Sequence, residues 1–223
     1  MIDNNQYQAL AELFKYPDSD FNNKILECQN VLNKHYPEQA EILQVFTDYV
    51  LPLDQDKKEE LFTKTFDVQP ICYLDLGYVI FGEDYKRGTF LMYMKEEQRA
   101  IGRDCSPELP DHLYHVLYLI TIHPNKEFVD ELVAKIIVPG VEKLIKEFDS
   151  AKVELKIQVI KRLHKALIQE ELNIGNVYRN AFIALRDVML IDFKEAIEAH
   201  CPIVEDTVRD SFFNKNNSVL VNK

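Results

Sequence analysis

Glycine and proline are scarce in this sequence, contributing 6 and 9 of its 223 residues. A turn-rich β-sandwich, a collagen-like repeat and a low-complexity chain all need more of them, so these classes are disfavoured. Hydrophobic residues make up 47% of the chain, enough to bury a sizeable core in one domain or in at most two small ones. The composition favours a soluble helical protein.

Cysteine is also sparse, and the four cysteines lie far apart without a CxxC pair (Cys28, Cys72, Cys105 and Cys201). Small disulfide scaffolds carry a higher density of cysteine, and zinc sites usually pair their ligands at short spacing. We therefore expect free thiols.

Basic residues are outnumbered, because 26 Lys and Arg face 37 Asp and Glu and leave a net charge of −11. Nucleic-acid affinity depends largely on Lys and Arg that neutralise phosphates, so DNA and RNA are disfavoured as partners. The same field attracts cationic segments, which favours a basic peptide as ligand.

Long apolar runs are absent as well. The longest stretch without Asp, Glu, Lys or Arg spans 14 residues, 112–125, whereas a membrane-spanning helix needs roughly 18 or more apolar residues. The N-terminus lacks the cationic start and apolar block of a secretory signal. The sequence predicts no membrane span and a cytoplasmic location.

Apolar residues recur at helical spacings of three and four along most of the chain. We expect a first helix that ends at Tyr16-Pro17, a second that runs to about Lys34, a third that begins at Pro37 and a fourth that begins at about Lys57. Three further helices are expected over 84–101, 110–122 and 125–148, and Pro139-Gly140 should kink or split the last of these. Two more carry Val153 to Leu167 and Val177 to Met189. The pattern predicts an all-α, single-domain bundle of about eight to ten helices over residues 1–210, followed by a loose polar tail, 211–223.

The middle of the chain, residues 66–112, mixes turns with short helical pieces and is where we expect any functional site. Nucleotide loops (GxxxxGK[ST], GxGxxG) and hydrolase motifs (GxSxG, HExxH) are missing. The densest polar cluster runs from Glu108 to His112 and continues at His115. Its two histidines lie one helical turn apart, where both can reach one ligand or metal.

Three interpretations of this cluster stay open. In the first, Asp111, His112 and His115 hold a metal. In the second, Asp111 caps the helix or pairs locally, while His112 hydrogen-bonds the neighbouring loop. In the third, Asp111 and His112 lie at the edge of a groove that receives a cationic peptide.

A second charged cluster, 83–87, is flanked by Gly82 and Gly88. It is either a solvated helix start or a turn that presses against the helix led by Pro110. Nearby aromatic residues line a groove or belong to the core: Tyr73, Tyr78, Phe81, Tyr85 and Phe90.

One series of residues carries a family resemblance: Thr65-Phe66-Asp67, Leu76, Gly82-Glu83, Arg87-Gly88, Met92, Gly102 and Glu108-Leu109-Pro110-Asp111-His112-Leu113. In order and spacing it resembles the molybdoenzyme assembly chaperones of the nitrate reductase delta subunit (NarJ) type, most clearly over about residues 58–122.

The resemblance implies an all-helical cytoplasmic chaperone, related more distantly to the TorD and DmsD chaperones. Such proteins bind the apoprotein of a molybdenum enzyme's catalytic subunit, often at an N-terminal twin-arginine or vestigial leader. They hold it until the molybdopterin cofactor is inserted, and they are absent from the finished enzyme. The resemblance implies no catalysis, cofactor or metal in the chaperone itself.

By position, Asp111 and His112 match the family's acidic-His motif at the leader groove, while Gly82, Glu83, Arg87 and Gly88 match its other signature turn. The expected peptide-binding set is Phe81, Gly82, Glu83, Arg87, Pro110, Asp111, His112 and His115. Respiratory nitrate reductase is the first candidate client, and related chaperones serve dimethyl sulfide, selenate, chlorate or hydrocarbon dehydrogenases. We expect a monomer, with a dimer swapped through the loop 149–152 as the alternative.

Two other functions remain as alternatives. One is a metal-dependent helical enzyme that uses Asp111, His112 and His115. The other is a structural subunit that stays in its complex.

Overall fold

The computed structural model describes residues 5–68, 70–149 and 165–200, with the backbone alone for 165–176. The chain folds as one all-helical domain, which confirms the predicted fold class. Its helices are α1 (Asn5–Glu12), α2 (Phe21–His35), α3 (Pro37–Val50), α4 (Gln55–Phe66), α5 (Leu76–Phe81), α6 (Tyr85–Ala100), α7 (Leu113–Ile122), α8 (Lys126–Leu132), the π-helical turn η1 (Val133–Ile137), α10 (Lys165–Asp192) and α11 (Lys194–His200). Residues 138–149 are helical too, and the described residues hold no strand beyond one isolated bridge.

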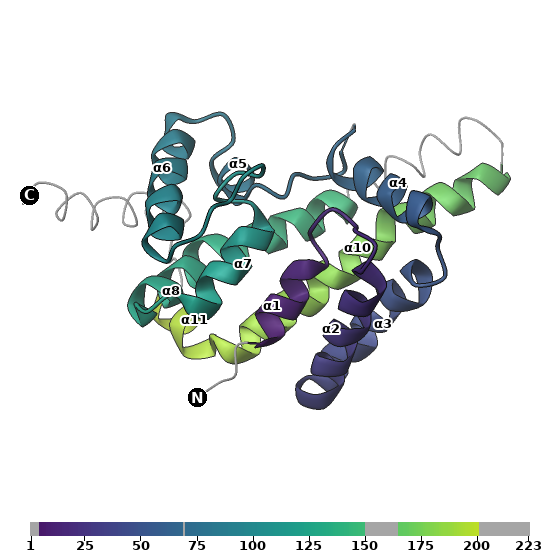
Figure 1. Cartoon of the computed structure of the whole chain (residues 1–223), viewed down its shortest axis with the longest axis horizontal. Coiled ribbons are helices and arrows are strands. Elements are labelled where there is room, and N and C mark those ends of the chain that lie inside the picture. Colours follow the sequence, from purple (N-terminus) through teal and green to yellow (C-terminus); the bar gives the residue numbers. More distant parts are fainter. Residues whose placement is uncertain (1–4, 69, 150–164, 201–223) are drawn as a thin grey trace, which may run out of the picture.

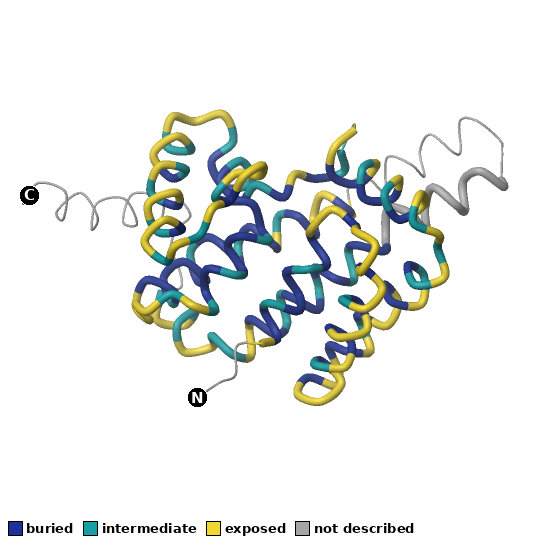
Figure 2. The backbone as a smooth tube through the Cα atoms, viewed as in Figure 1, coloured by how far each residue is buried: buried dark blue, intermediate teal, exposed yellow. Residues whose placement is uncertain are grey.

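The long helix α10 runs through the middle of the bundle and packs along α3 and against α1 (Figure 1). Its buried face carries Phe182, whose ring stacks on Phe14 at 4.7 Å between centroids. At its end, the Asp192 carboxylate accepts hydrogen bonds from Tyr7, Tyr36 and Gln6, which ties α10 to the first three helices. Buried residues line the facing sides of these helices in Figure 2, so the core lies between them.

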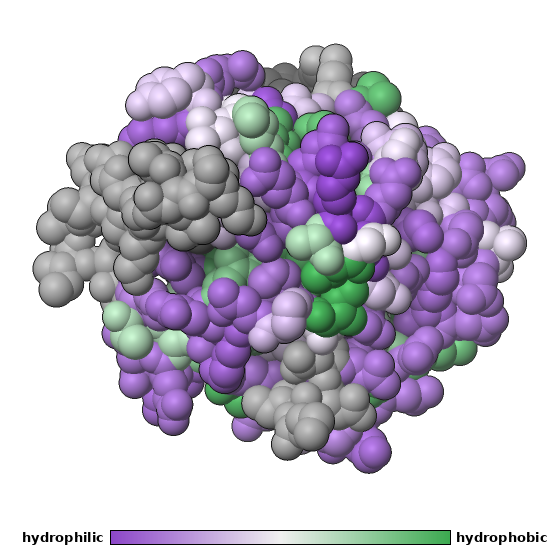
Figure 3. Space-filling view, turned by 60° about the vertical axis from the view of Figure 1, so that its left-hand side comes forward, coloured by the Kyte–Doolittle hydropathy of each residue, from purple (hydrophilic) through white to green (hydrophobic). Residues whose placement is uncertain are grey.

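The other half of the bundle is built around α7, which packs against α1. Beside it, Leu76 and Ile80 of α5 lie against Gly140, where an added Cβ would come within 2.9 Å of Leu76 Cδ2. Helix α6 is peripheral, and Phe90, Met94 and Gln98 are its buried residues. The face turned forward in Figure 3 is mostly hydrophilic, with small groups of apolar residues near its centre.

Four predictions about helix boundaries and breaks were wrong. The first helix, α1, ends at Glu12 and not at Tyr16-Pro17. Pro110 does not open a helix, because α7 begins at Leu113 with His112 as its N-cap. The irregularity expected at Pro139-Gly140 lies earlier, as the π-helical turn η1, which ends at Ile137. The break expected before Val177 is absent, since α10 continues through Gly175.

Other predictions fall in part outside the described residues. These include the helix from Val153, most of the swap loop 149–152, Cys201 and the tail 211–223. Cys28, Cys72 and Cys105 are buried free thiols, as expected.

Among the described residues, no helix combines the length and the apolar character that crossing a membrane requires.

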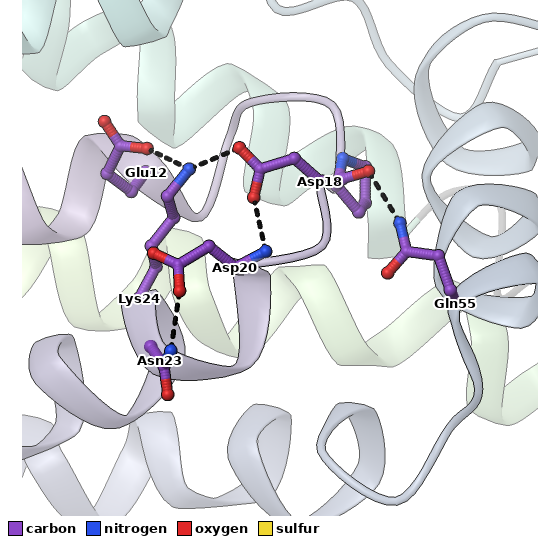
Figure 4. A network of polar contacts seen from close by, with 7 residues as sticks. Glu12, Asp18, Asp20, Asn23, Lys24 and Gln55 are labelled. Atoms are coloured by element: carbon purple, nitrogen blue, oxygen red, sulfur yellow. Dashed lines mark hydrogen bonds and ion pairs between the residues drawn. The ribbon is translucent and has the colours of Figure 1, made fainter.

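A polar network fixes the connection between α1 and α2 (Figure 4). Lys24 Nζ bridges Glu12 and Asp18, at 3.1 and 2.6 Å from their carboxylate oxygens. Gln55, the first residue of α4, donates a hydrogen bond to the carbonyl of Pro17 at 2.9 Å. The connection is therefore anchored to both α2 and α4, and Tyr16 within it contacts Phe62 and Glu59 of α4.

Candidate functional site

A cavity of about 630 Å³ opens between segments that are far apart in the sequence. Its walls come from the α1–α2 connection, the end of α4, the segment 73–75, the loop 103–108 and the first turn of α7. A volume of this order is typical of sites that enclose a small molecule or a few side chains of a peptide.

One wall of the cavity is acidic and consists of Asp67, Asp75 and Glu108. Burial and the charge of Asp111 raise the pKa of Asp75 to about 6, against the opposing effect of Arg87. The pKa of Glu108 is raised by partial burial and by the charges of Asp75 and Asp67. Partly buried carboxyl groups that lie near one another gain from a cation placed among them, so this wall is suited to a guanidinium or ammonium group.

Aromatic rings from four segments form the apolar part of the lining: Tyr16, Phe62, Phe66, Tyr73 and Tyr114. Tyr16 meets Phe62 edge to face at 5.6 Å, and its hydroxyl donates to Glu59. Tyr73 is 44% exposed, so its ring is free to contact a ligand. Such rings pack against aliphatic side chains and offer their faces to cations.

Two cations, Lys15 and Arg103, also line the cavity, and we call their part of the lining the basic end. The guanidinium of Arg103 lies 4.2 Å from the ring centroid of Tyr118, and its Nη2 is 3.3 Å from Nδ1 of His115. The cavity thus has an acidic wall and a basic end.

The structure brings His112 and His115 to the cavity together. His112 caps α7, because its Nδ1 accepts the backbone N–H of Tyr114 at 3.3 Å. Burial and the neighbouring His115 lower the pKa of His112 to about 4, while burial and Arg103 lower the pKa of His115. Both rings are therefore neutral at pH 7.

Asp111, expected at the edge of the groove, is completely buried and does not line the cavity. Its Oδ2 accepts the backbone N–H of Gly77 at 2.8 Å. On either side, Leu76 N donates to the Asp111 carbonyl and Leu113 N to the Leu74 carbonyl. Asp111 thus fastens the start of α5 to the residues before α7, and this junction carries Asp75 and His112 into the cavity.

Gly77 completes this junction, although nothing in the sequence singled it out. A Cβ on Gly77 would lie 2.6 Å from Asp111 Oδ2 and 3.0 Å from Phe90 Cδ1. Only glycine therefore fits without movement of its neighbours.

The second signature turn lies away from the cavity, since none of its residues lines it. Gly82 ends α5 with φ of 63°, and Glu83 is exposed. Arg87 lies 5.1 Å over the Tyr78 ring, and that ring meets Tyr73 edge to face at 4.8 Å. Arg87 does not line the cavity, but its charge acts on Asp75, and its guanidinium contacts Tyr78, whose ring meets the cavity residue Tyr73.

Gly88 does not press against another element, because no atom lies within 4 Å of where its Cβ would be. The close packing against a helix led by Pro110 is thus not found. Phe81 and Phe90 are buried, Pro110 is half-buried, and none of them lines the cavity.

A metal site at Asp111, His112 and His115 is not assembled. Asp111 Oδ2 and His112 Nδ1 already accept backbone N–H groups. Within the described part of the chain, no group of three or more His, Cys, Asp or Glu side chains could hold a metal ion.

In comparisons with known proteins, no family model and no curated protein matches the chain.

Proposed function

We propose that this protein is an assembly chaperone that binds a cationic segment of a client protein in the cavity and has no catalytic activity of its own. The client proposed from the resemblance of residues 65–113 is the apo catalytic subunit of a molybdopterin oxidoreductase, with respiratory nitrate reductase the first candidate. Binding takes place at the N-terminal leader, in the cytoplasm, before the cofactor is inserted.

The observation that carries the proposal is the acidic wall of Asp67, Asp75 and Glu108 beside exposed aromatic rings. A leader presents arginines together with apolar side chains, and such a segment matches carboxylates next to aromatic surface. The net charge of −11 adds long-range attraction for a basic segment.

The cavity also limits what the protein can hold. About 630 Å³ accommodates a few side chains and not a folded domain, so the contact is with an extended or helical segment of the client. Binding stabilises the assembly-competent client by mass action, and folding around the inserted cofactor ends it by removing the bound conformation.

The proposal is tested by capture of the client from the native host. A tagged full-length chain is expressed during anaerobic nitrate respiration, and its partners are identified by mass spectrometry. We expect a molybdoenzyme catalytic subunit that lacks its cofactor. Recovery of no such subunit while one is being synthesised contradicts the proposal, and co-purification with the mature enzyme supports a structural subunit instead.

Matched variants locate the contact. The double variant D75N/E108Q removes two carboxylates of the acidic wall at nearly constant size, and we expect it to capture at least tenfold less client. E83Q makes the same change in the exposed signature turn and should capture as much as the wild type. The opposite ranking would move the contact from the cavity to that turn.

A further inference from the structure

The two cations at the basic end of the cavity converge on one aromatic ring. Lys15 Nζ lies 5.5 Å and Arg103 Cζ 5.8 Å from the ring centroid of Tyr114. Among the described residues, neither forms an ion pair with a carboxylate. Of the neighbouring carboxylates, Asp104 accepts the backbone N–H of Ser106, and both Glu12 and Asp18 pair with Lys24. Two cations that line one cavity without an ion-pair partner attract an anion that enters it.

Arg103 is held in place by its surroundings. It follows Gly102, whose φ of 76° favours glycine, and its backbone N–H donates to the Gln98 carbonyl at 2.9 Å. Its guanidinium is fixed by the Tyr118 ring and by His115 Nδ1, which can accept because His115 is neutral. A cation positioned in advance loses little conformational entropy on binding a ligand.

One donor of Arg103 remains unused. Its Nε is buried and has no hydrogen-bond partner in the described structure. Buried donors are nearly always paired, and an unpaired one is destabilising. Because this atom has almost no exposed surface, an acceptor oxygen of a ligand reaches it only when the Arg103 side chain shifts towards the cavity.

From these contacts we infer that Lys15 and Arg103 form an oxyanion-binding subsite, for a carboxylate or a phosphate group, in the same cavity as the acidic wall. The subsite stands on its own geometry, independently of the chaperone function. If the proposed function holds as well, the bound client segment carries an acidic group in addition to its arginine, and the cavity selects for both charges.

The experiment observes Arg103 directly. In ¹⁵N-labelled full-length protein, the Nε–Hε resonance of Arg103 is assigned by its loss in R103Q and followed during titration. The probes are inorganic phosphate and the side-chain carboxylate of N-acetylglutamate amide, with N-acetylglutamine amide and sodium chloride as controls. We expect a saturable shift at millimolar concentration with at least one oxyanion, and none with the amide control.

Charge variants decide the assignment. K15Q should weaken the oxyanion affinity about tenfold, whereas K57Q, which removes an exposed lysine paired with Asp54, should leave it unchanged. Saturation with phosphate alone identifies free phosphate as the ligand, and saturation with the glutamate probe identifies a peptide carboxylate. A shift that only follows ionic strength, or that is the same in K15Q, overturns the inference.

The oxyanion titration and the client capture test separate claims. D75N/E108Q should leave oxyanion binding unchanged while it reduces client capture, so the oxyanion subsite and the chaperone function can each fail without the other.

Discussion

Replacing Gly77 by alanine is expected to destabilise the protein, because the new methyl group has no room. Its Cβ would lie 2.6 Å from Asp111 Oδ2 and 3.0 Å from Phe90 Cδ1, and both neighbours are completely buried. Overpacking of this kind costs about 1–3 kcal/mol. If Asp111 moves away, the buried hydrogen bond from Gly77 N is lost as well, at about 1–3 kcal/mol more.

The helix propensity of alanine offsets about 1 kcal/mol of this cost, so the net loss is about 1–5 kcal/mol, centred near 3 kcal/mol. Urea unfolding followed by circular dichroism measures it. With a slope of about 3 kcal/mol per molar, the midpoint falls by about 1 M.

Gly88→Ala is the matched control. Nothing lies within 4 Å of a Cβ at this exposed position in α6, so the same substitution should stabilise the protein by up to about 1 kcal/mol. If G77A leaves the midpoint unchanged, or if both variants shift it in the same direction, the role assigned to the Asp111–Gly77 junction is wrong.

Three further predictions concern titration and metal content. Because burial and Asp111 raise the pKa of Asp75 to about 6, above its unfolded value near 4, the folded state binds more protons between these values and stability falls as pH rises through them. D75N should therefore raise the melting temperature at pH 7.5 more than at pH 4. An equal rise in melting temperature at both pH values would show that the pKa of Asp75 is not raised. The pKa of His112 is lowered to about 4 from an ordinary 6.5, so its effect on stability changes with pH in the opposite direction. The stability that neutral His112 contributes is present above pH 6.5 and is lost as pH falls towards 4. H112A should also cost about 1 kcal/mol through the lost cap of α7, whereas H112N should restore most of it, and equal urea midpoints for the two variants would contradict the capping role. Elemental analysis of protein purified without chelator should find no stoichiometric zinc, iron or manganese, and one equivalent of any would revive the metal-enzyme alternative.

Local signals were enough to predict the fold. Pro37 begins α3 as expected because proline fits the first turn, and the apolar spacing of Val177, Ala181 and Leu185 marks the buried face of α10. Gly175 does not interrupt α10, since a single glycine costs a helix only about 1 kcal/mol relative to alanine.

The site was predictable only in part, because its geometry depends on contacts between distant residues. Sequence patterns drew attention to His112 and His115, and both line the cavity. They could not show that Asp111 turns inward to Gly77, a contact across 34 positions. They also missed Asp75, Lys15 and Arg103. These residues belong to no motif, and they line the cavity only because the fold brings their segments together.

The walls of the cavity come from residues 15–16, 62–75 and 103–115, which meet only when most of the bundle is in place. All the lining residues fall between positions 15 and 115, and a piece of the chain that lacks any one of the three segments lacks part of the cavity wall. A ligand that binds this cavity also favours the folded chain over the unfolded one, so the stability of the protein rises with the concentration of whatever occupies the cavity. The unliganded chain is the less stable form and the one more readily available to proteases.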